Sequence, residues 1–393
     1  MVSAIGLNRE EFWQSLAAGR SGICPLEGID PCRLRFRNAA QIRDFRPQDY
    51  FEERQASVMD RFSQLALAAA RQAVADSNIE WSPELRRRTA VVMGCGVGGK
   101  ETEEQSTHTF YGLASDRISP VAVVKGMPSA STSWIAMDQN LHGPAFTITT
   151  ACASAAHAIG EAFWLVRGGR ADLALAGGSE APLTPCLLKA WESMRVISPD
   201  TCRPFCRRRS GMILGEGAGV LVLEPLDRAK ARGAAIYAEL AGFGMSSDAH
   251  HVTQPCPEWA GEAMRAALED AGARPESVGY VNAHGTGTLA NDPAESKAIR
   301  RVFGDHTSQV AVSSTKSMHG HTLGAAGAIE AAATALAISR SLIPPTANFQ
   351  EPDPECDLNL VINSARPAEI ECAISSSLAF GGLNAILVFR RAT

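Results

Sequence analysis

Cys152 is the residue whose surroundings point most directly to chemistry. It follows an apolar, β-rich stretch at 146–149 and precedes an Ala-rich stretch without Pro that runs from 153 to about 166. The first pattern predicts a short buried strand and the second predicts a helix. At the start of a helix, unpaired N–H groups and the positive end of the helix dipole stabilise a thiolate, which predicts a nucleophile. The alternative is a free cysteine packed as a small apolar residue.

Two further stretches place polar side chains just after predicted strands. The loop Asn282-Ala283-His284-Gly285-Thr286 follows a strand predicted at 278–281. The segment Lys316-Ser317-Met318-His319-Gly320-His321 follows a strand predicted at 310–313. Active-site residues of α/β sheets favour such positions, although a histidine or lysine there can also be structural or simply solvated.

A Gly-rich turn, Ala379-Phe380-Gly381-Gly382, separates strands predicted at 372–376 and 385–389. Taken alone, it predicts a tight hairpin. Taken with the other stretches, it completes a set of one nucleophile, two imidazoles, an ammonium and a Gly-rich turn. That set predicts acyl transfer through a covalent thioester.

The elements that position these residues form two similar successions of strands and helices, divided near Pro225. Helices predicted at 153–166 and 323–339 are rich in Ala and Gly and apolar nearly all round, which predicts burial with close neighbours. Each follows directly on a candidate reactive residue. We therefore expect an internally duplicated layered fold. Its amino-terminal half, 1–225, carries the cysteine, and its carboxy-terminal half, 226–393, carries the His/Lys/His loops.

The bulk composition narrows the class of protein. A chain of 393 residues that is 45% hydrophobic can build a large core, and a net charge of −5 gives no nucleic-acid footprint. Ten cysteines without paired zinc-ligand spacing or an export signal indicate reduced thiols in a cytoplasmic protein. Runs of about eighteen uncharged apolar residues are missing, so no membrane span is expected.

With these residues in view, the chain resembles the β-ketoacyl-acyl-carrier-protein synthases, condensing enzymes of the thiolase fold, and most closely the synthase II type. The resemblance runs nearly end to end. It implies an α/β, thiolase-like fold in which two duplicated α/β halves form a five-layered αβαβα architecture. The motifs that carry it are Thr150-Ala151-Cys152-Ala153-Ser154, the His284 loop, Lys316 to His321, Gly324-Ala325-Ala326-Gly327 and Phe380-Gly381-Gly382.

The resemblance implies a role for each reactive group. Cys152 would accept the acyl chain, and the backbone N–H groups of Cys152 and Phe380 would form the oxyanion hole, with the Phe380 ring as a gate. His284 and His321 would stabilise the enolate that forms when a malonyl thioester loses carbon dioxide. How the two histidines divide this work stays open.

The remaining site residues implied by the resemblance are supporting ones. Lys316 is expected to orient the two imidazoles, with Glu295 as its carboxylate partner. His319 is expected to be a bystander. The pantetheine arm is expected to contact Thr253, Thr286 and Thr288.

The implied activity is decarboxylative Claisen condensation of an acyl thioester on Cys152 with malonyl-acyl carrier protein, giving a 3-oxoacyl-acyl carrier protein. It would serve fatty acid or specialised fatty-acyl or polyene biosynthesis. The alternative is the ketosynthase subunit of a heterodimeric polyketide-type synthase with a chain-length-factor partner. Phosphopantetheine arrives on the acyl carrier protein, so no cofactor and no metal is expected. We expect a homodimer, while a heterodimer with a chain-length-factor homologue is the other possibility.

Departures from the family pattern bear on the fold and on docking. Relatives begin with a strand ahead of the segment that matches Val2-Ser3-Ala4-Ile5-Gly6, so either the start is truncated or one sheet has lost a strand. Ser57-Val58 stands where basic carrier-protein contacts are expected, and Arg207-Arg208 is another candidate for them.

A thiolase-type enzyme and a scaffold without a nucleophile are the rival interpretations of the function. Lys316 with His321 argues against the first, and Cys152 against the second.

Overall fold

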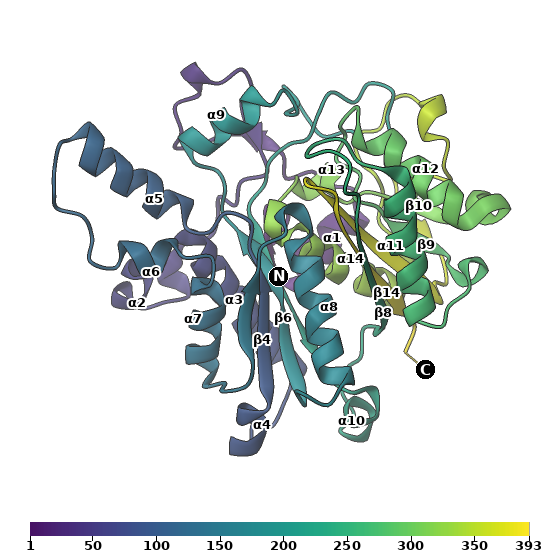
Figure 1. The fold of residues 1–393 in the computed structure, drawn as a ribbon, viewed down its shortest axis with the longest axis horizontal. Helices are drawn as coiled ribbons and strands as arrows, with labels where there is room; N and C mark the ends of the chain where they lie inside the picture. The colour runs from purple at the N-terminus through teal and green to yellow at the C-terminus, as the bar shows by residue number, and fades with distance from the viewer. Residues whose placement is uncertain (393) are drawn as a thin grey trace.

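The computed structural model describes residues 1–392, and two five-stranded sheets with helices on their faces dominate it (Figure 1). The sheet of the amino-terminal half has the order β1-β7-β6-β4-β5. Strands β4, β5 and β6 are parallel, whereas β7 is antiparallel to both β6 and β1. The strands are β1 (Val2–Ser3), β4 (Thr89–Gly94), β5 (Ala145–Ile148), β6 (Leu173–Glu180) and β7 (Gly217–Leu223).

The sheet of the carboxy-terminal half has the order β10-β9-β13-β14-β8. Here β10, β9 and β13 are parallel, and β14 is antiparallel to both β13 and β8. The strands are β8 (Glu239–Ser247), β9 (Tyr280–Asn282), β10 (Ala311–Ser313), β13 (Cys372–Ala379) and β14 (Leu383–Arg390). Counted along each half, the order and directions of the five strands are the same in both sheets, which confirms the predicted duplication.

Helices complete five layers around the two sheets. One outer layer packs on the amino-terminal sheet, one middle layer lies between the sheets, and a second outer layer packs on the carboxy-terminal sheet (Figure 1). This is the predicted αβαβα architecture. In the same order, the layers contain α3 (Arg61–Ser77) and α7 (Ala130–Gln139), then α8 (Ser154–Arg167) and α14 (Ala326–Arg340), then α11 (Pro257–Asp270) and α12 (Asn291–Phe303).

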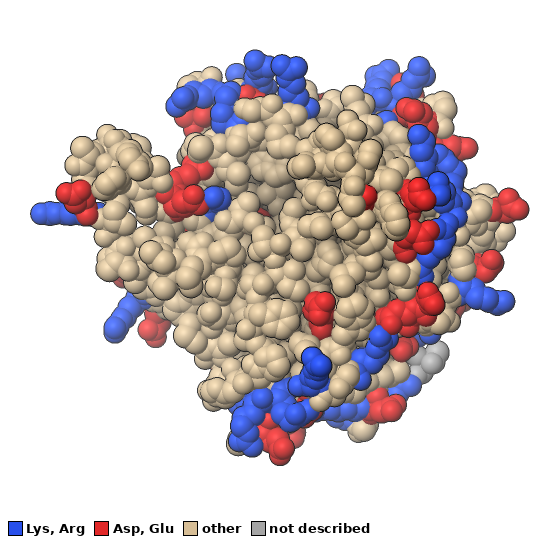
Figure 2. All heavy atoms as spheres, viewed as in Figure 1, with Lys and Arg blue, Asp and Glu red and all other residues tan. Residues whose placement is uncertain are grey.

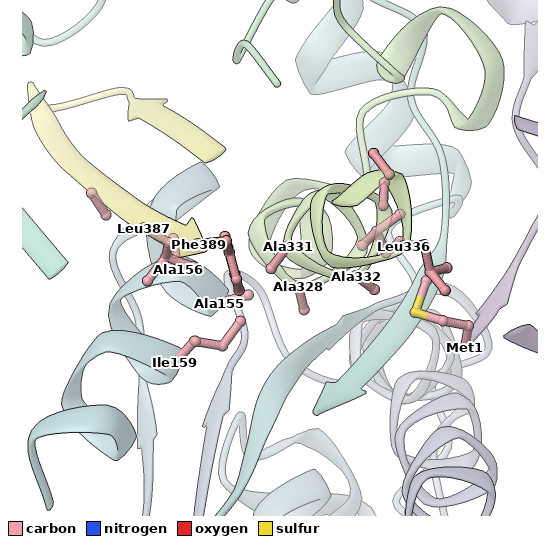
Figure 3. Packing of buried hydrophobic residues seen from close by; sticks show 14 of the residues in the cluster. Met1, Ala155, Ala156, Ile159, Ala328, Ala331, Ala332, Leu336, Leu387 and Phe389 are labelled. Carbon is pink, nitrogen blue, oxygen red and sulfur yellow. The ribbon is translucent and has the colours of Figure 1, made fainter. Parts of the chain in front are cut away.

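The two middle helices pack closely because their contact surfaces are made of small residues. Figure 3 shows α14 nearly end-on, with Ala331 on the side towards α8, and Ala155 and Ala156 projecting from α8. A Cβ atom on Gly327 would come within 2.7 Å of the Ala156 nitrogen, so only glycine allows this approach. The Ala- and Gly-rich composition of both segments therefore follows from their central position.

The other elements are shorter and connect or cover these layers. Within residues 1–392, no helix is both long and apolar enough to cross a membrane. The helices are α1 (Arg9–Ala17), α2 (Glu53–Ser57), α4 (Pro83–Arg87), α5 (Lys100–Thr107), α6 (Ala122–Gly126), α9 (Pro185–Ser193), α10 (Leu226–Ala231) and α13 (Lys316–His319). Two small ribbons pair β2 (Cys24–Pro25) with β3 (Asn38–Ala39) and β11 (Leu342–Ile343) with β12 (Arg366–Pro367).

Candidate active site

Cys152 lies in a single 3₁₀ turn, Ala151–Ala153, that joins the end of β5 to the start of α8. Ala151 has φ of +49°, a left-handed conformation that a residue with a side chain rarely adopts. Ser154 holds the turn, because its hydroxyl accepts the Thr150 N–H at 2.9 Å and donates to the Ala151 carbonyl at 2.6 Å. The strand–turn–helix setting predicted for Cys152 is confirmed.

Two imidazoles from the other half meet this thiol. His321 Nε2 lies 3.0 Å from Cys152 Sγ. The His284 ring stands edge-on to the His321 ring, with centroids 5.4 Å apart and planes at 86°. All three side chains are buried. The fold thus brings together residues that are more than 130 positions apart in the sequence.

Burial keeps both imidazoles neutral at physiological pH. It lowers the pKa of His284 and of His321 well below the usual range, and the nearby Lys316 ammonium lowers both further. Lys316 Nζ also lies 3.3 Å from His284 Nδ1. An ammonium only donates, so Nδ1 is the accepting nitrogen and the proton of His284 sits on Nε2. His284 is therefore a neutral hydrogen-bond donor at its free ring edge.

Lys316 is completely buried at the start of α13, and its ammonium has three partners. It donates to the His284 carbonyl at 2.7 Å, approaches His284 Nδ1, and forms an ion pair with Glu330 of α14. The prediction that Glu295 is the carboxylate partner of Lys316 is therefore wrong. Glu330 takes that place because α14 runs directly behind the Lys316 loop, where a single carboxylate interrupts its apolar surface.

Glu295 instead fixes the backbone of the His284 loop. Its two carboxylate oxygens accept the N–H groups of His284 at 2.7 Å and of Gly285 at 2.8 Å. Burial raises the pKa of Glu295 to about 7 even though these two N–H groups lower it. The predicted supporting position of Glu295 thus has a geometric basis, but its contact is with the backbone of the loop.

The ionisation state of the nucleophile differs from the sequence expectation. Burial raises the pKa of the Cys152 thiol to about 12, although the Lys316 ammonium and the N–H of Phe380 lower it. Removal of water from around the sulfur therefore outweighs the stabilising effect of the helix start. Burial therefore favours the thiol form of Cys152 over the predicted thiolate, with His321 Nε2 as the adjacent proton acceptor.

The Phe380 turn approaches the same sulfur from β13 and β14. The Phe380 N–H faces the Cys152 sulfur and lowers the pKa of that thiol. Gly381 and Gly382 have φ of +84° and +71°, a conformation that glycine adopts without strain. The Phe380 ring stacks on Trp191, with centroids 5.8 Å apart. A backbone donor and an aromatic ring therefore both border the thiol, as expected for an oxyanion hole and a gate.

A cavity of about 290 Å³ leads to this centre. Cys152, His284, His321 and Phe380 are among its lining residues, and so are the three predicted pantetheine contacts, Thr253, Thr286 and Thr288. The hydroxyls of Thr286 and Thr288 lie 2.9 Å apart. His319 is not among the lining residues: its ring nitrogens contact the Gly320 carbonyl and the Thr315 hydroxyl.

Two buried carboxylates near the site were not predicted. Glu330 was detectable as the single charged residue within an Ala-rich stretch. Glu180, at the end of β6, accepts the N–H groups of Gly96 at 2.6 Å and of Gly324 at 3.0 Å, and so ties a glycine turn of one half to the segment after His321. Burial raises the pKa of Glu180 to about 7. The only sequence signal for Glu180 was its place after the glycines that close a predicted strand.

Comparison with known protein families gives two matches along the chain. Residues 1–229 match the profile described as "Beta-ketoacyl synthase, N-terminal domain". Residues 237–350 match "Beta-ketoacyl synthase, C-terminal domain".

Individual relatives match over nearly the whole chain. Nodulation protein E of Rhizobium sp. (strain N33) is 46% identical over 99% of this chain and 97% of its own length. The 3-oxoacyl-[acyl-carrier-protein] synthase 2 of Staphylococcus aureus (strain COL) is 42% identical over 99% of this chain and 96% of its own.

Solved structures match as fully. The ishigamide ketosynthase/chain length factor has a TM-score of 0.94 at 36% identity, covering 99% of this chain and 96% of that one. AntDE:AntF, a type II PKS acyl-carrier protein in complex with its ketosynthase, has a TM-score of 0.88 at 32% identity, covering 99% and 97%.

Proposed function

The chain belongs to the beta-ketoacyl synthase family, a family of acyltransferase-type condensing enzymes, and from this premise we propose that Cys152, His284, His321 and Lys316 carry out its decarboxylative condensation. Cys152 is the nucleophile, the two imidazoles act on the extender, and Lys316 positions His284. The observation that carries the proposal is the contact of His321 Nε2 with Cys152 Sγ at 3.0 Å. This contact, and the fact that Cys152, His284 and His321 line the same cavity, support the proposal.

The first step transfers the acyl group. The Cys152 sulfur attacks the thioester carbonyl of the acyl carrier protein while its proton passes to His321 Nε2. The tetrahedral oxyanion accepts hydrogen bonds from the backbone N–H groups of Phe380 and Cys152. The intermediate collapses with cleavage of the carbon–sulfur bond, the carrier thiolate leaves and takes up the proton, and an acyl-Cys152 thioester remains.

The second step forms the carbon nucleophile and the new bond. A malonyl thioester placed with its carbonyl oxygen between the two rings loses carbon dioxide, and the electron pair of the broken bond becomes the enolate. Neutral His284 donates from Nε2 to the enolate oxygen, where negative charge accumulates, and His321 donates from Nε2 in the tautomer that carries its proton there. The enolate carbon attacks acyl-Cys152, the Cys152 thiolate leaves and takes up a proton from water, and a 3-oxoacyl thioester stays on the carrier.

Mass spectrometry of the intact protein tests this assignment. After incubation with acyl-loaded acyl carrier protein, the wild-type chain is expected to gain the mass of one acyl group on Cys152. The Cys152→Ala variant is expected to gain none. An adduct on another cysteine, or no adduct with any acyl donor, would contradict the assignment.

Acyl carrier protein is the partner that brings both substrates. In our proposal its pantetheine arm enters past Thr253, Thr286 and Thr288, and the chain holds no cofactor or metal of its own, which elemental analysis of active protein tests.

Lys and Arg side chains gather along the upper and right edges of Figure 2 and leave the middle of that face mostly uncharged. Arg207 and Arg208 are exposed but both pair with Glu351. Arg207→Glu is expected to raise KM for the carrier by a few-fold and to leave kcat unchanged.

A homodimer is the assembly we propose, through the free edge of the amino-terminal sheet. β5 is the last strand of that sheet, and Phe146 on it is 38% exposed. The chain ahead of α7, which packs on β5, exposes Tyr111 by 79% and Val123 by 76%. Pairing of β5 with its copy across a two-fold axis would cover both the open edge and these apolar side chains.

Light scattering after size-exclusion chromatography tests the dimer. The wild-type chain is expected at twice its monomer mass, and Val123→Asp is expected to shift it towards the monomer. The second candidate assembly is a heterodimer with a chain-length-factor homologue, favoured by the likeness to the ishigamide ketosynthase/chain length factor. A wild-type monomer that gains mass only with such a homologue would support this second assembly over the first.

A further inference from the structure

Three arginines precede β3 in a pattern that turns all of them outward. Arg33, Arg35 and Arg37 alternate along the chain with Leu34 and Phe36. The three arginines are exposed, whereas Phe36 is buried and Leu34 packs partly buried against the same core cluster. The two apolar side chains therefore anchor the segment, and the three guanidinium groups face the solvent. We call these three arginines the arginine stripe.

The segment that carries the arginine stripe is held by its backbone. Lys189 Nζ of α9 donates to the Arg33 carbonyl at 2.9 Å, and the Arg35 N–H donates to the Glu192 carboxylate of α9. The Arg37 carbonyl accepts the N–H of the first residue after β2 at 2.7 Å. The ion pairs formed within residues 1–392 involve none of the three guanidinium groups. Their charges are therefore available to another molecule.

Helix α9 connects the arginine stripe to the mouth of the active-site cavity. Trp191 of α9 stacks on the Phe380 ring, which borders the thiol. Met194 and Arg195 follow the end of α9 and line the cavity. A helix rises about 1.5 Å per residue, so Lys189, which holds the stripe, lies roughly 8 Å from Met194 along the axis. The stripe is therefore next to the entrance through which a substrate arm must pass.

The surroundings of the arginine stripe are basic, although the chain as a whole has a net charge of −5. The stretches 30–39 and 185–196 together contain five Lys and Arg residues against two carboxylates, Asp30 and Glu192. Figure 2 shows Lys and Arg side chains gathered along the upper edge of the molecule, over α9 of Figure 1. Such a surface attracts a partner that carries negative charge.

The mouth of the cavity itself is apolar. Met194, Val252 and Leu289 line the cavity, and they are 42%, 70% and 69% exposed. An apolar centre with charged side chains at its rim is the usual composition of a protein–protein interface. A protein that delivers a substrate into this cavity would cover the three apolar side chains and bring its carboxylates to the stripe.

We propose that the arginine stripe, together with the apolar mouth of the cavity, is the surface on which the acidic face of the acyl carrier protein docks. The family pattern places basic contacts at Ser57 and Val58, where α2 ends, and neither side chain is charged. The stripe supplies cations for the carrier beside α9 instead. The proposal rests on the proposed function and adds to it the surface by which the carrier is recognised.

The test compares two double variants that change the net charge equally. Arg33→Glu/Arg35→Glu reverses two charges of the stripe and keeps the backbone contacts that hold the segment. Arg87→Glu/Arg170→Glu, the control, reverses two exposed charges ahead of β4 and β6, at the end of the sheet away from Cys152. Carbon dioxide release is measured with two substrates. One is malonyl-loaded acyl carrier protein of Staphylococcus aureus, and the other is malonyl-pantetheine, which has the arm but no protein.

The stripe variant is expected to raise KM for the malonyl-loaded carrier by about tenfold at about 50 mM salt and to leave kcat unchanged. At about 500 mM salt this difference from the wild-type chain is expected to shrink, because salt screens exposed charges. With malonyl-pantetheine the stripe variant is expected to keep kcat/KM within about twofold of the wild-type value, since the active site is intact. The control variant is expected to match the wild-type chain with both substrates.

Three results would overturn the proposal. The first is a stripe variant with the same KM for the carrier as the control variant. The second is an equal loss of activity with malonyl-pantetheine, because the substitutions would then act on the active site. The third is a stripe variant that loses binding to vesicles of anionic phospholipid but keeps its KM for the carrier, which would assign the stripe to a membrane surface. A wild-type chain that releases carbon dioxide from neither substrate would refute the proposed function, and the docking surface with it.

Discussion

The two halves of the molecule have the same order and directions of strands but carry different reactive side chains. In each half a helix of the middle layer follows the third strand, and a reactive residue lies just before that helix: Cys152 before α8 and His321 before α14. After the second strand, the amino-terminal half has a glycine turn, whereas the carboxy-terminal half has the His284 loop with its buried Glu295. The amino-terminal half therefore supplies the sulfur, and the carboxy-terminal half supplies the two imidazoles.

This difference shows how a duplicated fold can separate two tasks. Holding an acyl group needs a small, dry pocket around a sulfur, and burial keeps the Cys152 thiol protonated. Decarboxylation needs donors whose protonation does not change near neutral pH, which burial beside Lys316 achieves for both histidines. Substitutions in one half should therefore affect one task more than the other.

The largest expected effect is on the nucleophile. Cys152→Ala should reduce condensation by at least about 10³-fold, because no other group can carry the acyl chain. Decarboxylation of malonyl-acyl carrier protein should persist, because the histidine pair belongs to the other half. Product formation and carbon dioxide release, measured in parallel, distinguish the two. Cys372→Ala, a buried cysteine in β13, is the control, and equal loss of both reactions in Cys152→Ala would break the comparison.

Substitutions of His284 and His321 are expected to affect different steps of the reaction. His284→Ala and His321→Ala should each slow decarboxylation by about 10²- to 10³-fold, the usual result of removing one donor to a developing oxyanion. Only His321→Ala should also slow acylation of Cys152, because His321 alone contacts the sulfur. Rapid-quench measurement of the acyl adduct tests this. Equal acylation rates in the two variants would show that His321 takes no proton in the first step.

The buried ion pair between Lys316 and Glu330 should contribute to the free energy of unfolding. Lys316→Met leaves Glu330 buried without its partner and should lower the free energy of unfolding by about 3–5 kcal/mol. Burial already raises the pKa of Glu330 to about 7. Between pH 4.5 and that pKa, Glu330 is protonated in the folded variant and ionised in the unfolded chain, which favours the folded state. The loss of unfolding free energy should therefore be smaller at pH 6 than at pH 8.

Urea denaturation at pH 6 and pH 8 measures both effects. The double variant Lys316→Met/Glu330→Gln is the control and should be more stable at pH 8 than Lys316→Met alone. A loss for Lys316→Met that does not depend on pH would mean that Glu330 stays charged without the lysine.

The smallest expected effect concerns the pH dependence of the thiol. Since burial raises the pKa of Cys152 to about 12, the thiolate is a minor species at pH 7. Alkylation of Cys152 by iodoacetamide should therefore accelerate by about tenfold per pH unit between pH 7 and pH 9. Peptide mass spectrometry measures the rate at this site against the other cysteines. An alkylation rate that stops rising below pH 8 would show that the helix start lowers the pKa of Cys152 more than burial raises it.

Much of the fold and of the site could be predicted from local patterns. The two Ala-rich segments predicted the two buried helices, and the strand–turn–helix setting of Cys152 was visible in the stretch 146–166. The bounds of β8, Glu239–Ser247, are harder to predict from the sequence. Gly242 and Gly244 obscure its end, because they lower strand propensity but are required where α11 packs directly on the backbone.

The remaining features depend on packing that no local pattern reveals. Glu295 and Glu330 both lie within fifteen residues or so of a site residue, and only the path of α14 decides which one meets Lys316. The protonation of Cys152 is a balance between a helix start and burial, and burial is a property of the folded molecule. Glu180 acts through contacts to two turns that are more than 220 positions apart in the sequence.

The position of the Phe380 turn has a consequence for the life of the newly made chain. Ribosomes deliver the amino-terminal half first, and domains fold as they emerge. The cysteine is therefore made long before the backbone donor of Phe380, which comes from the last hairpin of the chain, β13 and β14. In the proposed mechanism the oxyanion hole therefore forms only after β13 and β14 have paired.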